Sequence, residues 1–240
     1  MIELSTRDRL MLALDVPGAA DARRLVDLLG DSVSFYKIGL QLFLSGGYFE
    51  LGDWLRERGK KVFADLKLFD VPQTVSSAVR QLVDRDVDYV TVHGNDEILR
   101  AAVEASRGHP GILAVTVLTS LDRADMEDLG FRTDISAVVV SRARRAAQIG
   151  CAGVIASGHE TAAIREVVPP DFRIVVPGIR PAATAGTDDQ KRTVDVEDAF
   201  AAGADHIVMG RPIRSAPDPR GAAEDVQRRI AAIFETADAS

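Results

Sequence analysis

The sequence has little cysteine and no long apolar run. Cys151 is the only cysteine among 240 residues, so no disulfide can form within the chain, and no Cys/His cluster has the spacing of zinc ligands. Nowhere do 18 apolar residues follow one another, and the charged stretch Met1 to Asp8 lacks the apolar segment of a signal sequence. We therefore expect no membrane span and a location in the reducing cytoplasm.

Positive charge is also scarce. The chain has 29 Lys and Arg residues against 36 Asp and Glu residues, a net charge of −7. Nucleic-acid binding depends on clustered basic residues, so no nucleic-acid partner is expected. An anionic ligand must then be bound by a few local cations.

No Gly-x-Gly-x-x-Gly turn follows the first apolar run, which argues against a doubly wound dinucleotide-binding fold, the main competing architecture. Eight β-rich apolar runs instead alternate with segments of helical periodicity, which is typical of parallel βα units. At this length the pattern predicts a single (β/α)8 TIM barrel over residues 1–240. The expected strands are Leu10 to Asp15, Val33 to Ile38, Lys61 to Leu66, Val87 to His93, Ile112 to Val117, Gly153 to Ser157, Arg173 to Pro177 and His206 to Gly210.

Polar residues stand where most of these runs end. In a barrel of this kind the active site lies at the carboxyl ends of the strands, so these residues are the candidates for chemistry. They are Asp15, Lys37, Asp65, Lys67, His93, Thr119, Ser120 and Arg211.

The densest group is Asp65-Leu66-Lys67-Leu68-Phe69-Asp70. The two-residue period of a strand turns Asp65 and Lys67 to one face, whereas Asp70 lies beyond the strand and its direction is not fixed by spacing. With Lys37 from the preceding strand, two ammonium and two carboxylate groups form an expected alternating array. The alternative is a set of solvated ion pairs, but charges at the carboxyl end of an interior strand favour catalysis.

Two further segments point to an anion. Val175 to Gln190 is long for a connection and rich in small residues, which is typical of a binding loop or lid, and a disordered surface loop is the alternative. Gly210 and Arg211 follow the last strand, where barrels often bind phosphate, although such a pair alone is also common in turns. Three other residues are expected to be structural: His93, Cys151 and His159.

The stretch from Asp65 to Thr74 resembles the signature of the orotidine 5′-phosphate decarboxylase family. Pro177 to Pro181, Asp189 to Arg192 and Gly210 to Pro212 resemble that family's lid and phosphate motifs in order and spacing. The likeness spans Leu10 to about Pro219. Two positions depart from the pattern: Phe69 replaces a common histidine, and the segment from His93 to Asp96 lacks an expected glycine pair.

The resemblance implies decarboxylation of orotidine 5′-phosphate to uridine 5′-phosphate, with neither a metal nor an organic cofactor. It assigns Lys67 as the group that stabilises and protonates the carbanion-like centre, with Asp65, Asp70 and Lys37 as the other catalytic residues. It also implies a homodimer in which Asp70 and Thr74 reach the neighbouring site. The implied substrate-binding residues are Asp15, Lys37, Thr74, Thr119, Arg180, Gln190, Gly210 and Arg211.

Two other functions stay open. One is a sugar-phosphate aldolase or decarboxylase of the same barrel group, in which the Asp-x-Lys-x-x-Asp residues hold magnesium. The other is a barrel that binds a phosphorylated metabolite without turnover.

Overall fold

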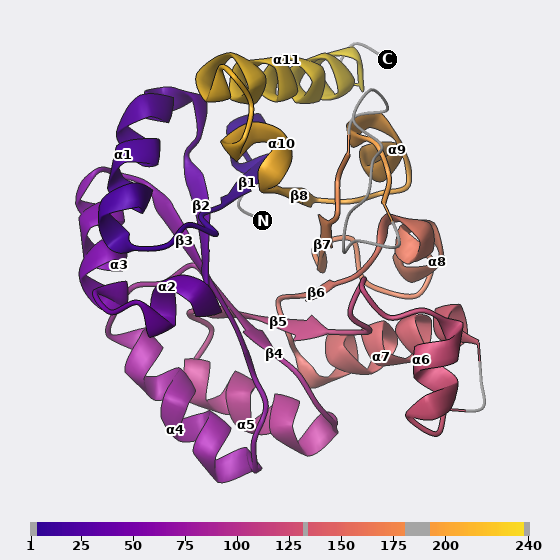
Figure 1. Ribbon diagram of the computed structural model, residues 1–240. Coiled ribbons are helices and arrows are strands. Elements are labelled where there is room, and N and C mark those ends of the chain that lie inside the picture. Colours follow the sequence, from indigo (N-terminus) through magenta and orange to yellow (C-terminus); the bar gives the residue numbers. More distant parts are fainter. Residues whose placement is uncertain (1–3, 132–133, 181–192, 238–240) are drawn as a thin grey trace.

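The computed structural model describes residues 4–131, 134–180 and 193–237, and within them eight parallel strands close into a barrel (Figure 1). Each strand pairs with its neighbours in sequence, and the first pairs with the last. The predicted (β/α)8 barrel is confirmed, and the doubly wound alternative is wrong. The strands are β1 Leu10–Ala13, β2 Phe35–Gly39, β3 Lys61–Leu68, β4 Tyr89–Val92, β5 Gly111–Val115, β6 Gly153–Ile155, β7 Arg173–Pro177 and β8 His206–Met209.

Helices surround the strands on the outside of the barrel (Figure 1). Their starts carry the expected signals: Pro72 opens α4, and the Asn95 side chain accepts a hydrogen bond from the Ile98 amide (3.2 Å) at the start of α5. The α-helices are α1 Ala19–Leu29, α2 Leu40–Leu44, α3 Tyr48–Glu57, α4 Pro72–Val83, α5 Asp96–Ser106, α6 Arg123–Asp128, α7 Ile135–Ile149, α8 Thr161–Arg165, α9 Val196–Ala201, α10 Arg211–Arg214 and α11 Pro219–Ala237, and the short 3-10 helices are η1 Thr6–Arg9, η2 Gly30–Ser32 and η3 Gly158–Glu160.

Side chains alternate between two cores. Residues such as Val62 and Ala64 of β3 pack outward against the helices, whereas Phe63 points inward. The inner core is apolar and consists of Met11, Ala13, Phe35, Phe63, Leu113, Val175 and Val208. Continuing the inward positions along β2 and β3 gives Lys37 and Asp65, so the interior changes from apolar to charged toward the carboxyl ends of the strands.

Several strand ends differ from the prediction by up to two residues. β2 and β4 begin at Phe35 and Tyr89 rather than at Val33 and Val87, although both valines are buried. An apolar run in the sequence indicates which residues are buried, not which are hydrogen-bonded in the sheet. Buried residues continue into the loops beyond the strand, so the predicted strand ends differ from the observed ones. β3 extends to Leu68, because its end carries an irregularity that hydrophobicity does not reveal.

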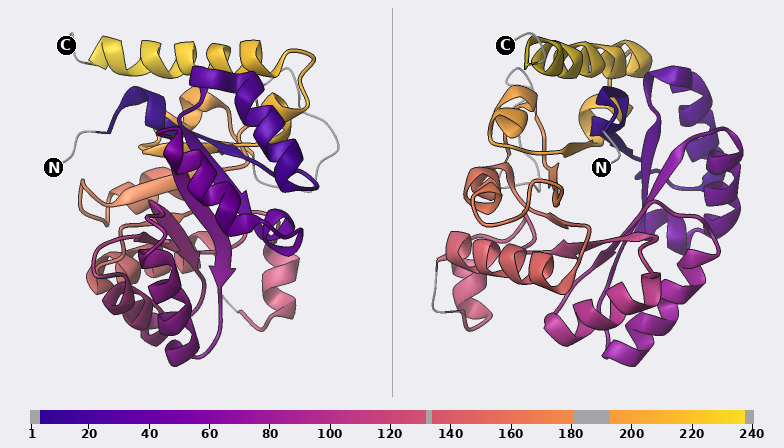
Figure 2. Two further views of the ribbon diagram at one scale, coloured as in Figure 1. Left: turned by 90° about the vertical axis from the view of Figure 1, so that its left-hand side faces the viewer. Right: turned by 180° about the vertical axis from the view of Figure 1, so that it is seen from behind.

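The two ends of the barrel differ. In the left view of Figure 2, α2 and α6 lie on the side opposite η1, and they follow the carboxyl ends of β2 and β5. No helix in the described ranges is both long and apolar enough to cross a bilayer.

Candidate active site

A cavity of about 340 Å³ lies at the carboxyl ends of the strands. Its walls come from β1, β2, β3, β5, β6, β7 and β8, from loops that follow these strands and from α10. It brings together nine of the residues predicted from sequence: Asp15, Lys37, Asp65, Lys67, Thr119, Ser120, Arg180, Gly210 and Arg211.

Four charged side chains cross one wall of this cavity in alternating sign, and we call Asp15, Lys37, Asp65 and Lys67 the charged row. Lys37 Nζ lies 3.3 Å from Asp15 Oδ1 and 3.2 Å from Asp65 Oδ2. Lys67 Nζ lies 2.8 Å from Asp65 Oδ1. The same-face prediction for Asp65 and Lys67 is thus fulfilled, with both side chains turned into the cavity.

The centre of the charged row is buried, and its ends are open. The side chains of Lys37 and Asp65 are each 12% exposed, whereas those of Asp15 and Lys67 are 47% and 36% exposed. Burial by itself lowers the pKa of Lys37, but attraction to Asp65 and Asp15 outweighs it and the pKa is raised. Burial likewise raises the pKa of Asp65, yet Lys37, Lys67 and a Thr91 hydrogen bond bring it below its usual value. Both groups are therefore held in their charged forms.

The backbone at Lys67 is unusual, because its φ of 46° is in the left-handed region. The register of β3 against β4 shifts there: Ala64 faces Val90 and Leu68 faces Val92. The Lys67 amide donates a 2.9 Å hydrogen bond to the Thr91 hydroxyl. Sequence reasoning missed Thr91, since a threonine inside an apolar strand gives no sign of such a contact.

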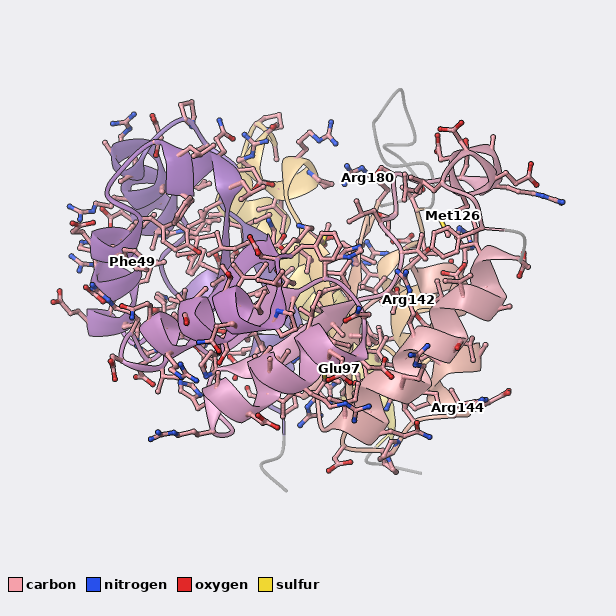
Figure 3. All side chains as sticks on the ribbon, turned by 90° about the horizontal axis from the view of Figure 1, so that it is seen from below. Phe49, Glu97, Met126, Arg142, Arg144 and Arg180 are labelled. Carbon is pink, nitrogen blue, oxygen red and sulfur yellow. The ribbon has the colours of Figure 1, made fainter. Side chains whose placement is uncertain are left out.

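The cavity lining also contains three arginines. Arg180 and Arg211 were predicted, and Arg214, three residues further along α10, also lines the cavity. The spacing of Arg211 and Arg214 on one helix was the signal that could have identified the third arginine. In Figure 3, Arg180 lies toward the same edge of the molecule as Met126 of α6. A site with three guanidinium groups suits an anionic ligand.

Two predicted residues lie outside the cavity. Asp70 and Thr74 are exposed, and Asp70 Oδ1 accepts a 2.6 Å hydrogen bond from the Val71 amide. Within one chain, the second carboxylate of the alternating array is therefore Asp15 rather than Asp70. Gln190 lies outside the described residues.

The lesser candidates His93 and Cys151 do not line this cavity. His93 packs against Phe69 with ring centroids 5.2 Å apart, so the two departures from the family pattern touch each other. His93 lines a separate cavity with Arg142 and Arg145. Cys151 is buried, and burial raises the pKa of its thiol to about 12. In the described part of the chain, no three His, Cys, Asp or Glu side chains are grouped as metal ligands.

The closed barrel and its charged cavity at the strand ends are the construction of an α/β-barrel enzyme. A family model described as "Orotidine 5′-phosphate decarboxylase / HUMPS family" matches residues 8–226. The chain belongs to this family.

Curated relatives agree with this membership. The orotidine 5′-phosphate decarboxylase of Methylococcus capsulatus is 55% identical over 227 residues, which cover 95% of this chain and 93% of the relative. That of Xanthomonas euvesicatoria is 52% identical, with 97% and 96% covered. A crystal structure of the enzyme from Lactobacillus acidophilus matches with a TM-score of 0.82 at 31% identity, covering 93% of this chain and 99% of that one.

Proposed function

We propose that this chain removes the carboxylate of orotidine 5′-phosphate as carbon dioxide and releases uridine 5′-phosphate, the last step of pyrimidine synthesis, with neither metal nor organic cofactor. The supporting observation is that the charged row and three arginines line the same cavity. In this proposal the arginines bind the phosphate, and the charged row acts on the carboxylate that is removed.

Lys67 is the group that acts on the ring in this proposal. Breaking the bond to the carboxylate leaves its electron pair on a pyrimidine carbon, and an adjacent ammonium stabilises that charge and then transfers a proton to the carbon. The Lys67 side chain is 36% exposed in the cavity and its Nζ lies 2.8 Å from Asp65 Oδ1, so it is both anchored and accessible. Lys37 holds the other side of Asp65 and keeps the geometry fixed.

Asp65 acts on the leaving carboxylate. Two ammonium groups keep Asp65 ionised despite its burial, so the substrate carboxylate meets a fixed negative charge. At an effective dielectric constant of 20, like charges about 4 Å apart repel by about 4 kcal/mol. Departure of neutral carbon dioxide relieves this repulsion.

The rest of the cavity binds the parts of the substrate that do not react. Arg211, the Gly210 amide and Gln190 bind the phosphate, and Arg180 closes a lid over it. Asp15 and Lys37 bind the ribose hydroxyls, and Thr119 binds the pyrimidine. Binding energy from the phosphate then stabilises a closed, water-poor site in which the charges act strongly.

The active form is a homodimer in this proposal, and Asp70 and Thr74 serve the neighbouring subunit's site. Two observations support this. Both residues are exposed and outside their own chain's cavity. Large apolar side chains are also exposed on α2 and after β3, and we call them the apolar rim: Leu40, Phe43, Leu44, Phe69 and Val71. Water contact of such a group is unfavourable, and a second copy of the chain would cover it.

We also propose that the enzyme works in the cytoplasm. The only cysteine of the chain is a buried free thiol, a state that a reducing compartment preserves.

The test is an assay of purified protein with orotidine 5′-phosphate, following the loss of the orotate ultraviolet absorbance. Lys67→Ala is expected to fold but to lose turnover by several orders of magnitude, because its charge acts in the transition state. Lys61→Ala is the matched control: Lys61 begins the same strand at the opposite end and pairs with Asp8 (2.7 Å). Near-normal turnover in Lys67→Ala contradicts the proposal.

A second arm of the assay separates the proposal from the alternative left open by the sequence, a magnesium-dependent sugar-phosphate enzyme of the same barrel group. Turnover is expected to persist in a chelator. Activity that disappears with the chelator and returns with magnesium contradicts the cofactor-free mechanism.

A further inference from the structure

The end of β3 contains two residues more than the segment of β4 that it pairs with. Between the pairs Ala64–Val90 and Leu68–Val92, β3 contains three residues and β4 contains only Thr91. Such a bulge leaves backbone groups without their usual ladder partners. The extra length of β3 includes Asp65 and Lys67, so the bulge lies within the charged row.

The Thr91 hydroxyl bonds to both residues at this bulge. It accepts the Lys67 amide hydrogen at 2.9 Å and donates to Asp65 Oδ1 at 2.9 Å. The direction of each bond is fixed, since an amide only donates and a carboxylate only accepts, and a hydroxyl can do both at once. Thr91 itself is fully buried (0% exposed), so water does not compete for the hydroxyl.

These bonds close a small ring. Asp65 Oδ1 receives both the Thr91 hydroxyl and the Lys67 ammonium (2.8 Å), and the backbone of Lys67 returns to Thr91. Lys67 adopts a φ of 46°, a conformation that is unfavourable for a non-glycine residue and persists only where neighbouring contacts enforce it. The bond from the Lys67 amide to Thr91 is such a contact.

We propose that Thr91 is a positioning residue for the decarboxylation: its hydroxyl holds the Asp65 carboxylate and the Lys67 backbone at the spacing the reaction needs. The inference rests on the proposed roles of Asp65 and Lys67. Thr91 acts through these two residues and does not touch the substrate, since it is absent from the cavity lining.

The test is a series at Thr91 in the full-length enzyme. Thr91→Val keeps the shape and removes the hydroxyl, and it is expected to lower kcat by about tenfold to a hundredfold with little change in KM, because misplaced groups affect the transition state more than substrate binding. Thr91→Ser keeps the hydroxyl and is expected to stay within about threefold of the unmodified enzyme. Thr161→Val is the matched control, since Thr161 is also fully buried and its hydroxyl donates to a backbone carbonyl (Ser157, 3.2 Å) away from the cavity.

The pH profile of kcat gives a readout that a purely structural role would not move. Loss of the hydroxyl donor raises the pKa of Asp65, so the acid limb is expected to move to higher pH in Thr91→Val and to stay in place in Thr91→Ser and Thr161→Val. If Thr91→Val does not fold, Thr91→Ala compared with Thr91→Ser decides the same question.

Unchanged kcat in the variants lacking the hydroxyl, or an equal loss in Thr91→Ser, overturns the positioning role. Lys67→Ala is measured alongside. Turnover in Lys67→Ala contradicts the proposed mechanism as a whole, whereas an inactive Lys67→Ala with a fully active Thr91→Val contradicts only the role of Thr91.

Discussion

Lys37 shows how much one residue can do in this site. Its ammonium lies between Asp15 and Asp65 and is buried, so it neutralises two carboxylates that are held within one cavity. Removal of Lys37 would leave Asp65 buried beside a single remaining cation, and an underpaired buried charge is costly. The catalytic geometry and the local stability thus depend on the same side chain.

Arg211 offers a test of phosphate recognition at the level of one residue. Arg211→Ala is expected to reduce kcat/KM for orotidine 5′-phosphate by about tenfold to a hundredfold or more, since a hydrogen bond to a charged group contributes about 1.5 to 3 kcal/mol. Orotidine, which lacks the phosphate, is expected to react equally slowly with both enzymes. The measurement is kcat/KM for each substrate.

Arg123→Ala serves as the control, because Arg123 is an exposed surface arginine paired with Glu127 (2.8 Å). The assignment of Arg211 to the phosphate is wrong if the variant reduces orotidine turnover as strongly as turnover of the phosphorylated substrate.

At the scale of the elements, Gly153 of β6 lies directly against the backbone of Arg173 in β7. A Cβ added there would lie 2.2 Å from the Arg173 carbonyl oxygen, a backbone atom that cannot move aside. Gly153→Ala is therefore expected to destabilise the fold by about 3 kcal/mol, as measured by urea denaturation. Gly52→Ala is the opposite case: it lies within α3 with no atom nearer than 4.0 Å, and it is expected to stabilise the fold by up to about 1 kcal/mol. Equal stability of the two variants would contradict the role given to Gly153.

The elements also show how far the sequence could predict the structure. The barrel was predictable because apolar runs alternate with helical segments along the sequence. The shared direction of the Asp65 and Lys67 side chains was predictable because side chains two residues apart in a strand point to the same face. Thr91 was not, since its contact depends on a bulge that is set by pairing between β3 and β4. The direction of Asp70 was also open, because a loop rather than a strand carries it.

At the scale of the whole molecule, substitutions in the apolar rim test the proposed homodimer. Leu44 is 81% exposed on α2. Leu44→Glu is expected to shift the protein from dimer to monomer in sedimentation and to lower turnover, because a charge disfavours burial at an interface and a monomer lacks the neighbour's Asp70 and Thr74. Leu28→Glu is the control, since Leu28 is another exposed leucine (50%) but lies near the end of α1, outside the apolar rim. A fully active monomer of the unmodified chain would contradict the proposed dimer.

The buried thiol of Cys151 can be used to measure local opening of the structure around it. A thiol with a pKa of about 12 that is only 6% exposed reacts with a labelling reagent mainly while the structure around it is locally open. Since the sequence contains no other cysteine, every labelled thiol reports a local opening around Cys151. The labelling rate of Cys151 therefore measures how often this region opens. A bound nucleotide that lowers the labelling rate would do so by stabilising the closed structure.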